Sequence, residues 1–124
     1  NLLRAQRKFA ESEPLFRQAM NAYERTRGKT FRSITELRVR LGEVLTGLER
    51  FAEAEAELLS AQQTIESAPE QFQRARVPNL KAMIALYESW DKADPGKGHD
   101  AKAAERKADL DALSAASPTT TAKP

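Results

Sequence analysis

The chain has no cysteine among its 124 residues and carries a single histidine. Without thiols it can form no disulfide, no thiolate nucleophile and no cysteine-based metal site. It contains no apolar stretch approaching the about 18–20 residues that a membrane-spanning helix needs. Its first residues, NLLRAQRKFAESEP, also lack the apolar segment of a signal peptide. We therefore expect a cytoplasmic protein that has no membrane partner.

Glycine and β-branched residues are scarce, whereas Ala, Leu, Glu, Arg, Lys and Gln are abundant. This composition favours α-helix. The length is enough for one domain. Because the first residue is Asn rather than Met and the opening residues already have a helical pattern, we expect the chain to be a piece of a longer protein.

Positive charge is concentrated in the first half of the chain. Residues 1–50 hold 11 Lys and Arg against 6 acidic residues, whereas residues 51–124 hold 9 against 12. The densest basic segment contains Arg25, Arg27, Lys29, Arg32, Arg38 and Arg40. A nucleic-acid-binding domain of this size usually has a larger basic excess and a recognisable motif. We therefore predict an acidic protein partner or a solvated turn here, and no nucleic-acid partner.

One sequence pattern occurs twice, with an offset of 42 residues: KFAESEPLFRQAMN begins at Lys8 and RFAEAEAELLSAQQ at Arg50. An offset of this size is typical of helical repeat proteins. Within the repeat, apolar residues spaced three and four apart predict two amphipathic helices. These residues are Leu37, Leu41, Val44, Leu45 and Leu48, then Phe51, Ala54, Leu58 and Ala61. The small Gly42 and Ala54 predict a close approach of the two helices, which must stack on neighbours to bury their apolar faces.

The middle unit resembles a tetratricopeptide repeat (TPR). This family places a small residue between large apolar ones, an aromatic residue at the turn, and alanines along the second helix. The matching residues are Leu41, Gly42, Leu45, Phe51, Ala54, Leu58 and Ala61. The 42-residue period resembles the longer subclass found in kinesin light chains. The last unit is similar to the C-terminal TPR end of bacterial multidomain proteins such as serine/threonine protein kinases.

The resemblance implies an all-α fold, an α-α superhelix of antiparallel helix pairs. We expect a repeat domain at 1–113, with a half-unit at 1–27, units at 33–67 and 70–113, a loop insertion at 93–100, and a disordered tail at 114–124. Helices are predicted at about 1–6, 10–27, 33–48, 52–66, 70–91 and 100–114. Pro14 is expected in the first turn of its helix. Pro78 is expected to kink the 70–91 helix or to mark its start.

In TPR proteins the first helix of each pair lines a concave groove that binds a peptide or protein. The equivalent outward positions here are Asn1, Arg4, Glu36, Val39, Glu43, Thr46, Lys81, Ala85 and Glu88. Some TPR domains clamp a C-terminal carboxylate with asparagine and basic side chains. Because Glu43 and Ala85 occupy two of those clamp positions, and Glu43 would repel a carboxylate, we do not expect this clamp.

The residues that could carry chemistry have simpler structural interpretations. His99, beside Asp100, is predicted to be a solvated loop residue, and its segment GKGHD does not match a phosphate-binding loop. The recurring glutamates Glu11, Glu13, Glu53, Glu55 and Glu57 are predicted to complement helix dipoles. Trp90 is predicted to pack in the core. We therefore expect no catalytic residue, no metal site and no cofactor.

These observations predict a non-catalytic protein–protein interaction module of TPR type, from the C-terminal part of a larger protein. The alternative is a regulatory or substrate-recruiting tail of a bacterial serine/threonine protein kinase or another signalling enzyme. A third hypothesis is an end cap, because Lys107, Asp109 and Asp111 would give the last helix a polar outer face. The apolar edge at Leu2, Leu3 and Phe9 is predicted to contact upstream repeats or to self-associate.

Overall fold

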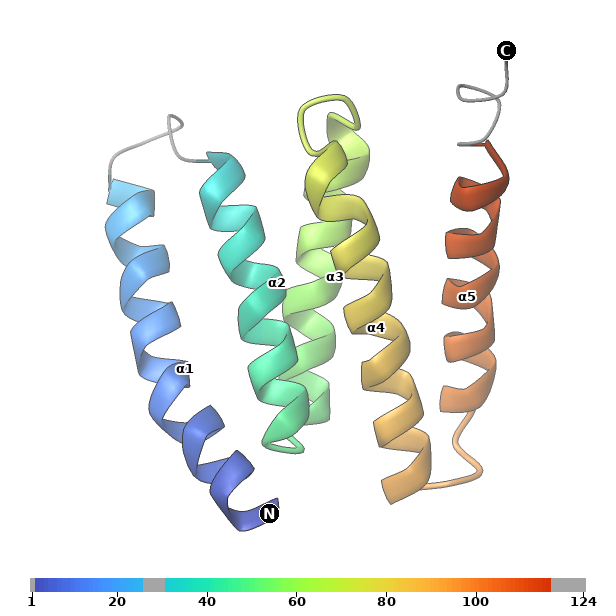
Figure 1. The fold of residues 1–124 in the computed structure, drawn as a ribbon, viewed down its shortest axis with the longest axis horizontal. Helices are drawn as coiled ribbons and strands as arrows, with labels where there is room; N and C mark the ends of the chain where they lie inside the picture. The colour runs from blue at the N-terminus through green and yellow to red at the C-terminus, as the bar shows by residue number, and fades with distance from the viewer. Residues whose placement is uncertain (1, 26–30, 117–124) are drawn as a thin grey trace.

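The computed structural model describes residues 2–25 and 31–116, and all secondary structure in these two ranges is α-helical. The helices are α1 (Leu2–Arg25), α2 (Phe31–Gly47), α3 (Phe51–Ser67), α4 (Gln73–Ala93) and α5 (His99–Ala116) (Figure 1). The predicted all-α class is therefore confirmed. Of the predicted tail, residues 114–116 belong to α5 and the remainder lies outside the described residues.

Helix α1 is one continuous helix rather than the two predicted at 1–6 and 10–27. Pro14 lies near its middle, so the prediction that Pro14 occupies a first turn is wrong. A proline inside a helix removes the hydrogen bond to the carbonyl four residues earlier, here that of Ala10, and its ring crowds that carbonyl. The helix continues because α1 packs against α2 on both sides of Pro14, and it bends in its N-terminal half (Figure 1).

Helix α4 begins at Gln73, so Pro78 lies in its second turn and does not mark its start. The helix continues to Ala93, and α5 begins at His99. The connecting loop therefore covers only residues 94–98, and the predicted insertion at 93–100 is partly wrong. Part of the added length extends α4 instead, which has 21 residues where α2 has 17. Gly96 and Gly98 adopt positive φ angles of 83° and 88°, which glycine tolerates, in this short loop.

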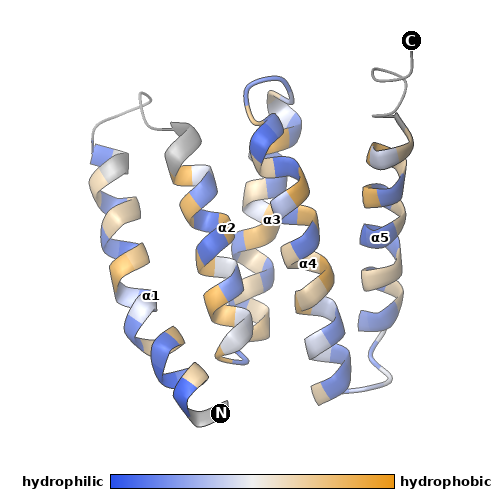
Figure 2. Ribbon diagram, viewed as in Figure 1, coloured by the Kyte–Doolittle hydropathy of each residue, from blue (hydrophilic) through white to orange (hydrophobic). Residues whose placement is uncertain are grey.

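The five helices form two layers. Consecutive helices run antiparallel, and α2 and α4 lie side by side in front of α3 (Figure 1). Each helix contacts its neighbours along the chain, and α2 also contacts α4. Each helix carries both hydrophilic and hydrophobic residues (Figure 2), as expected for amphipathic helices that bury one face.

The main core lies between α2, α3 and α4, and its largest fully buried side chains include Leu41, Leu45, Leu58, Met83 and Leu86. Gly42 allows α2 to approach α3 closely, because a Cβ atom there would lie 2.4 Å from Leu58 Cδ2. Ala54 is fully buried in the same cluster. The predicted close approach of these helices is therefore confirmed.

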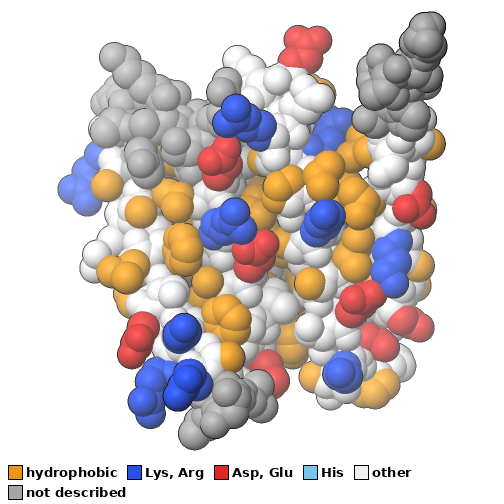
Figure 3. All heavy atoms as spheres, viewed as in Figure 1, with side chains coloured by type: hydrophobic (Ala, Val, Ile, Leu, Met, Phe, Trp, Pro, Cys, Tyr) orange, Lys and Arg blue, Asp and Glu red, His pale blue; other side chains and the backbone are white. Residues whose placement is uncertain are grey.

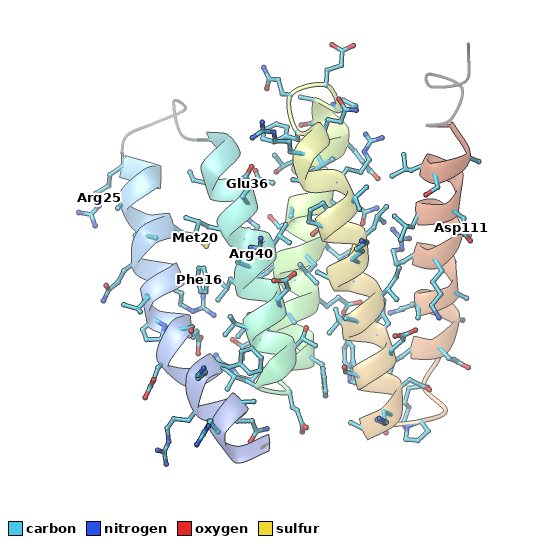
Figure 4. The ribbon with its side chains drawn as sticks, viewed as in Figure 1. Phe16, Met20, Arg25, Glu36, Arg40 and Asp111 are labelled. Atoms are coloured by element: carbon cyan, nitrogen blue, oxygen red, sulfur yellow. The ribbon has the colours of Figure 1, made fainter. Side chains whose placement is uncertain are left out.

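The sequence predicted that Phe9 lies on an exposed apolar edge, and this prediction is wrong for Phe9. Its half-buried ring lies against Gly47 of α2, where a Cβ atom would be 2.2 Å from Phe9 Cε2. The absence of a side chain at Gly47 creates the space for this ring. Phe16 and Met20 also point from α1 toward α2 (Figure 4) and pack on the main core. The side chains of Leu2 and Leu3 lie outside the described set.

Within the described ranges, none of the helices has both the length and the apolar character needed to cross a membrane.

Candidate partner-binding face

Helices α2 and α4 present adjacent faces with a shallow depression between them. This α2/α4 depression has a volume of about 310 Å³ and is lined by Glu36, Val39 and Arg40 from α2 and by Arg74, Ala75 and Pro78 from α4. Its walls combine apolar and charged side chains. Glu36 and Arg40 lie one turn apart on the same side of α2 (Figure 4). Such a depression can accept a mixed polar and apolar segment.

Pro78 gives the depression an exposed apolar ring. A proline has no N–H, so it cannot donate to the carbonyl of Arg74, which lies four residues earlier in the same helix. Pro78 is exposed, and both residues line the depression.

Charges of both signs surround the depression. Arg40 Nη1 lies 3.2 Å from Glu43 Oε1, in an exposed pair within α2. Exposed pairs of this kind contribute little to folding stability. Positive and negative side chains alternate across this face (Figure 3). Lys81 of α4 is also exposed. The face is therefore suited to a protein surface of mixed charge rather than to a polyanion.

The residues predicted to line a groove do not all lie on the same surface. Glu36 and Val39 line the depression, but Val39 is only 2% exposed and belongs to the core. Its predicted outward position is wrong, because α4 packs over this part of α2. Glu43, Lys81 and Ala85 are exposed on the same two helices.

Three further predicted positions lie elsewhere or are engaged within the fold. Thr46 donates a 2.9 Å hydrogen bond to the Gly42 carbonyl and lines a separate cavity of about 360 Å³. Glu88 is tied to α5 by a 2.7 Å ion pair with Lys107. Arg4 is exposed on α1 and does not line the depression. Asn1 lies outside the described residues.

Sequence reasoning missed four residues of the depression, namely Arg40, Arg74, Ala75 and Pro78. Helical spacing could have indicated Arg40 and Pro78, because Arg40 lies one turn after Glu36 and Pro78 lies one turn after Arg74. The TPR resemblance places its groove at other positions of the repeat. The contact between α2 and α4 decided which residues meet.

His99 is buried rather than solvated, so the prediction of a loop histidine is wrong. It is 7% exposed and stacks on Trp90 with ring centroids 4.0 Å apart. Trp90 in turn stacks on Phe51 at 5.7 Å and packs against the main core, which confirms its predicted packing role. The imidazole begins α5, where the short preceding loop returns the chain against α4. Burial of these ring faces is favourable and attaches α5 to the core.

Glu13 has a different role from the predicted dipole complement. Because α1 is continuous, Glu13 lies in mid-helix and pairs with Arg17 at 2.9 Å and with Arg50. Burial acts to raise the pKa of the Glu13 carboxyl, but hydrogen bonds from the two arginines lower it overall. Glu53 does lie in the first turn of α3, and its hydrogen bonds from Arg50 lower its pKa.

The basic segment does not form one continuous patch in the described residues. Arg38 binds Glu57 of α3 at 3.0 Å, whereas Arg40 pairs with Glu43 within α2. Arg25 is exposed at the end of α1 and points away from the other helices (Figure 4). Arg27 and Lys29, and the side chain of Arg32, lie outside the described residues.

No group of three or more His, Asp or Glu side chains in the described ranges could hold a metal ion. No protein-family model, no curated protein and no solved structure matches the chain. Its function is therefore inferred from its own residues and geometry.

Proposed function

We propose that the chain is a non-catalytic, TPR-like protein–protein interaction module. It offers the face of α2 and α4, centred on the α2/α4 depression, to a peptide or protein partner. The observation that carries the proposal is the depression itself, where the exposed ring of Pro78 lies among two arginines and a glutamate.

The spacing of the helices supports a repeat architecture. Helix α2 begins at Phe31 and α4 at Gln73, which reproduces the 42-residue offset of the sequence pattern. The two equivalent helices lie side by side. Helix α3 packs behind them, and α5 packs beside α4 (Figure 1). Stacked helix pairs of this kind use the surface of equivalent helices for binding in repeat proteins.

The partner chemistry follows from the side chains of the depression. Arg40 and Arg74 favour carboxylates, Glu36 favours a basic group, and the exposed Pro78 favours an apolar side chain. An extended segment with an acidic, a basic and an apolar residue supplies all three groups.

The proposal is tested by affinity capture from a lysate of the source organism, with the unmodified chain and the variant Arg40→Glu/Arg74→Glu as bait. We expect the variant to capture at most about one tenth as much of any specific partner as the unmodified chain does, because interface arginines often dominate binding. Lys8→Glu/Lys97→Glu is the matched control, since it reverses the same number of positive charges at exposed residues outside the depression.

Circular dichroism would verify that the three proteins have the same helix content. Capture that is equal for the depression variant and the control would contradict the proposal. A partner lost from both variants would indicate a general charge effect and would also contradict it.

A further inference from the structure

Helix α1 lies at one edge of the fold, where α2 is the only described helix whose backbone approaches it (Figure 1). Phe16 and Met20 point from α1 toward α2 (Figure 4). The opposite side of α1 carries exposed residues spaced three and four apart, which therefore share one face of the helix. The members of this α1 outer face are Glu11, Leu15, Gln18, Ala22 and Arg25. Leu15 is 65% exposed, the highest value for a large hydrophobic side chain in the described ranges.

The 42-residue sequence repeat indicates which kind of element fits the α1 outer face. Helix α3 is the repeat equivalent of α1, but its backbone approaches both α2 and α4. The α3 equivalents of Leu15, Gln18 and Ala22 are Glu57, Ser60 and Thr64. These three α3 residues are half-buried, and Glu57 Oε1 lies 3.0 Å from Arg38 Nη1 of α2. A helix therefore covers this side of α3, whereas the same side of α1 is open.

The charges of the α1 outer face complement a second copy of the same face. Glu11 and Arg25 lie at its two ends, seven residues before and after Gln18. When two copies of α1 lie antiparallel about a two-fold axis near Gln18, Glu11 of each copy lies near Arg25 of the other. A parallel pair would instead bring like charges together. The face therefore attracts an antiparallel copy of itself.

The middle of the face is self-complementary as well. The Gln18 amide is both a donor and an acceptor, so two Gln18 side chains related by the two-fold axis can hydrogen-bond to each other. Leu15 and Ala22 lie one turn before and after Gln18. In the antiparallel arrangement each Leu15 therefore packs near the small Ala22 of the other copy and loses its contact with water, which is favourable.

We propose that the α1 outer face is a self-association surface, on which a second copy of the chain packs its own α1 in the antiparallel direction. The contact uses the same residues on both copies and therefore closes a two-fold dimer. None of these residues lines the α2/α4 depression, so the dimer leaves two depressions accessible to partners. The surface and the depression are independent, and either can fail without the other.

The dimer is expected to be weak. Each copy brings one leucine and one alanine to the centre of the contact, which is small for a stable interface. Arg4 and Lys8 are exposed on the same side of α1, beyond the paired segment, and their positive charge opposes association. We therefore expect a dissociation constant of roughly 0.1–1 mM.

Sedimentation equilibrium of the unmodified chain, from about 0.02 to about 2 mM, measures the association directly. The average mass should rise from that of a monomer toward that of a dimer. Leu15→Ser should increase the dissociation constant at least about tenfold, because both copies lose their central apolar side chain. Leu59→Ser is the matched control, since Leu59 is also an exposed leucine but lies on α3. Circular dichroism verifies that both variants keep their helix content.

Charge reversal tests the antiparallel pairing. Glu11→Arg places two arginines opposite each other at both ends of the contact, and Arg25→Glu places two glutamates there. Each single variant should associate at least about threefold more weakly than the unmodified chain. A mixture of the two single variants should associate more strongly than either alone, because every arginine then meets a glutamate. The double variant Glu11→Arg/Arg25→Glu should recover the affinity of the unmodified chain.

A cysteine introduced on α1 tests the position of the two-fold axis, since the chain has no cysteine of its own. Gln18→Cys should form an intermolecular disulfide under mild oxidation, because position 18 lies beside itself in the dimer. Lys8→Cys is the control on the same side of α1, and it should cross-link much less because position 8 lies far from the axis.

The proposal is overturned if the unmodified chain stays monomeric over the whole concentration range. Equal weakening by Leu15→Ser and Leu59→Ser would also overturn it, because association would then be a general hydrophobic effect. A mixture of the charge variants that associates no better than either alone would refute the pairing of Glu11 with Arg25. Preferential cross-linking through Lys8→Cys would indicate a parallel pair and would equally contradict the proposal.

Discussion

At the scale of single residues, Gly42 decides how closely α2 approaches α3. The Leu58 side chain is fully buried and occupies the space that a Cβ atom at position 42 would need. Alanine is the better helix former by about 1 kcal/mol, so the glycine costs intrinsic helix stability. Glycine is therefore accepted here for packing rather than for backbone conformation.

The substitution Gly42→Ala is expected to destabilise the chain by about 1–2 kcal/mol, because overpacking a filled core outweighs the gain in helix propensity. In the background Leu58→Ala the same substitution is expected to be neutral or stabilising, since the clash is gone. Urea unfolding followed by circular dichroism gives the four free energies of unfolding. A Gly42→Ala effect of the same sign and size in both backgrounds would show that Leu58 is not the obstacle.

At the scale of helices, Arg50 joins elements that are distant in sequence. It lies at the turn before α3 and binds Glu13 of α1 and Glu53 of α3, the latter at 2.7 Å. Tyr87 performs a similar role on the other side of the fold, where its hydroxyl donates to Glu55 Oε2 at 2.8 Å. Lys102 of α5 lies 3.5 Å from the same carboxylate. These contacts join helices that are distant in sequence, in addition to the apolar packing between them.

The Arg50 contacts predict a loss of stability in acid. The pKa values of Glu13 and Glu53 are lowered from 4.5 in the folded chain, so the folded state binds fewer protons than the unfolded state. Their stabilisation is complete above the ordinary pKa of 4.5 and is lost as the pH falls through the lower folded values. The melting temperature should therefore decrease below about pH 4.5.

The variant Arg50→Met should melt at a lower temperature than the unmodified chain at neutral pH and should depend less on pH in this acidic range. The difference between the two proteins should shrink as the carboxylates become protonated. Arg40→Met is the matched control, because its exposed pair lies within one helix. Parallel melting curves for Arg50→Met and the unmodified chain across the acidic range would refute this role of Arg50.

At the scale of the whole molecule, the contacts are mainly between neighbours. In the described ranges, the backbones of α2 and α4 each approach three other helices, whereas that of α1 approaches only α2 and that of α5 only α4. Among the α5 side chains that the structure describes, those of His99 and Ala103 are buried. In such quasi-linear folds the terminal elements are the least stable.

Native-state hydrogen exchange should show this gradient. We expect the amides of α1 and α5 to exchange at least about tenfold faster than those of α2 and α3, through local opening. The substitution His99→Ala removes the stacking on Trp90 and should accelerate exchange in α5 without changing α1, which serves as the internal control. Uniform protection over all helices, or equal acceleration of α1 and α5, would instead indicate one cooperative unit.

The sequence by itself determined the all-α class, the approximate positions of α2 to α5 and the close approach at Gly42. Helical periodicity and small residues report directly which face of a helix is buried, because both are local properties of the chain. The TPR resemblance and the partner remain predictions. Within the described residues, the sequence also indicated correctly that Trp90 packs against the core.

Only the tertiary structure decided the continuity of α1, the burial of His99 and Val39, and the composition of the α2/α4 depression. Each depends on contacts between residues far apart in sequence, such as Phe9 with Gly47 or Val39 beneath α4. Local propensity places Pro14 at the start of a helix and His99 in a loop, but burying apolar faces against a neighbouring helix outweighs these small preferences. The sequence therefore specified the helices, and their packing specified which residues meet.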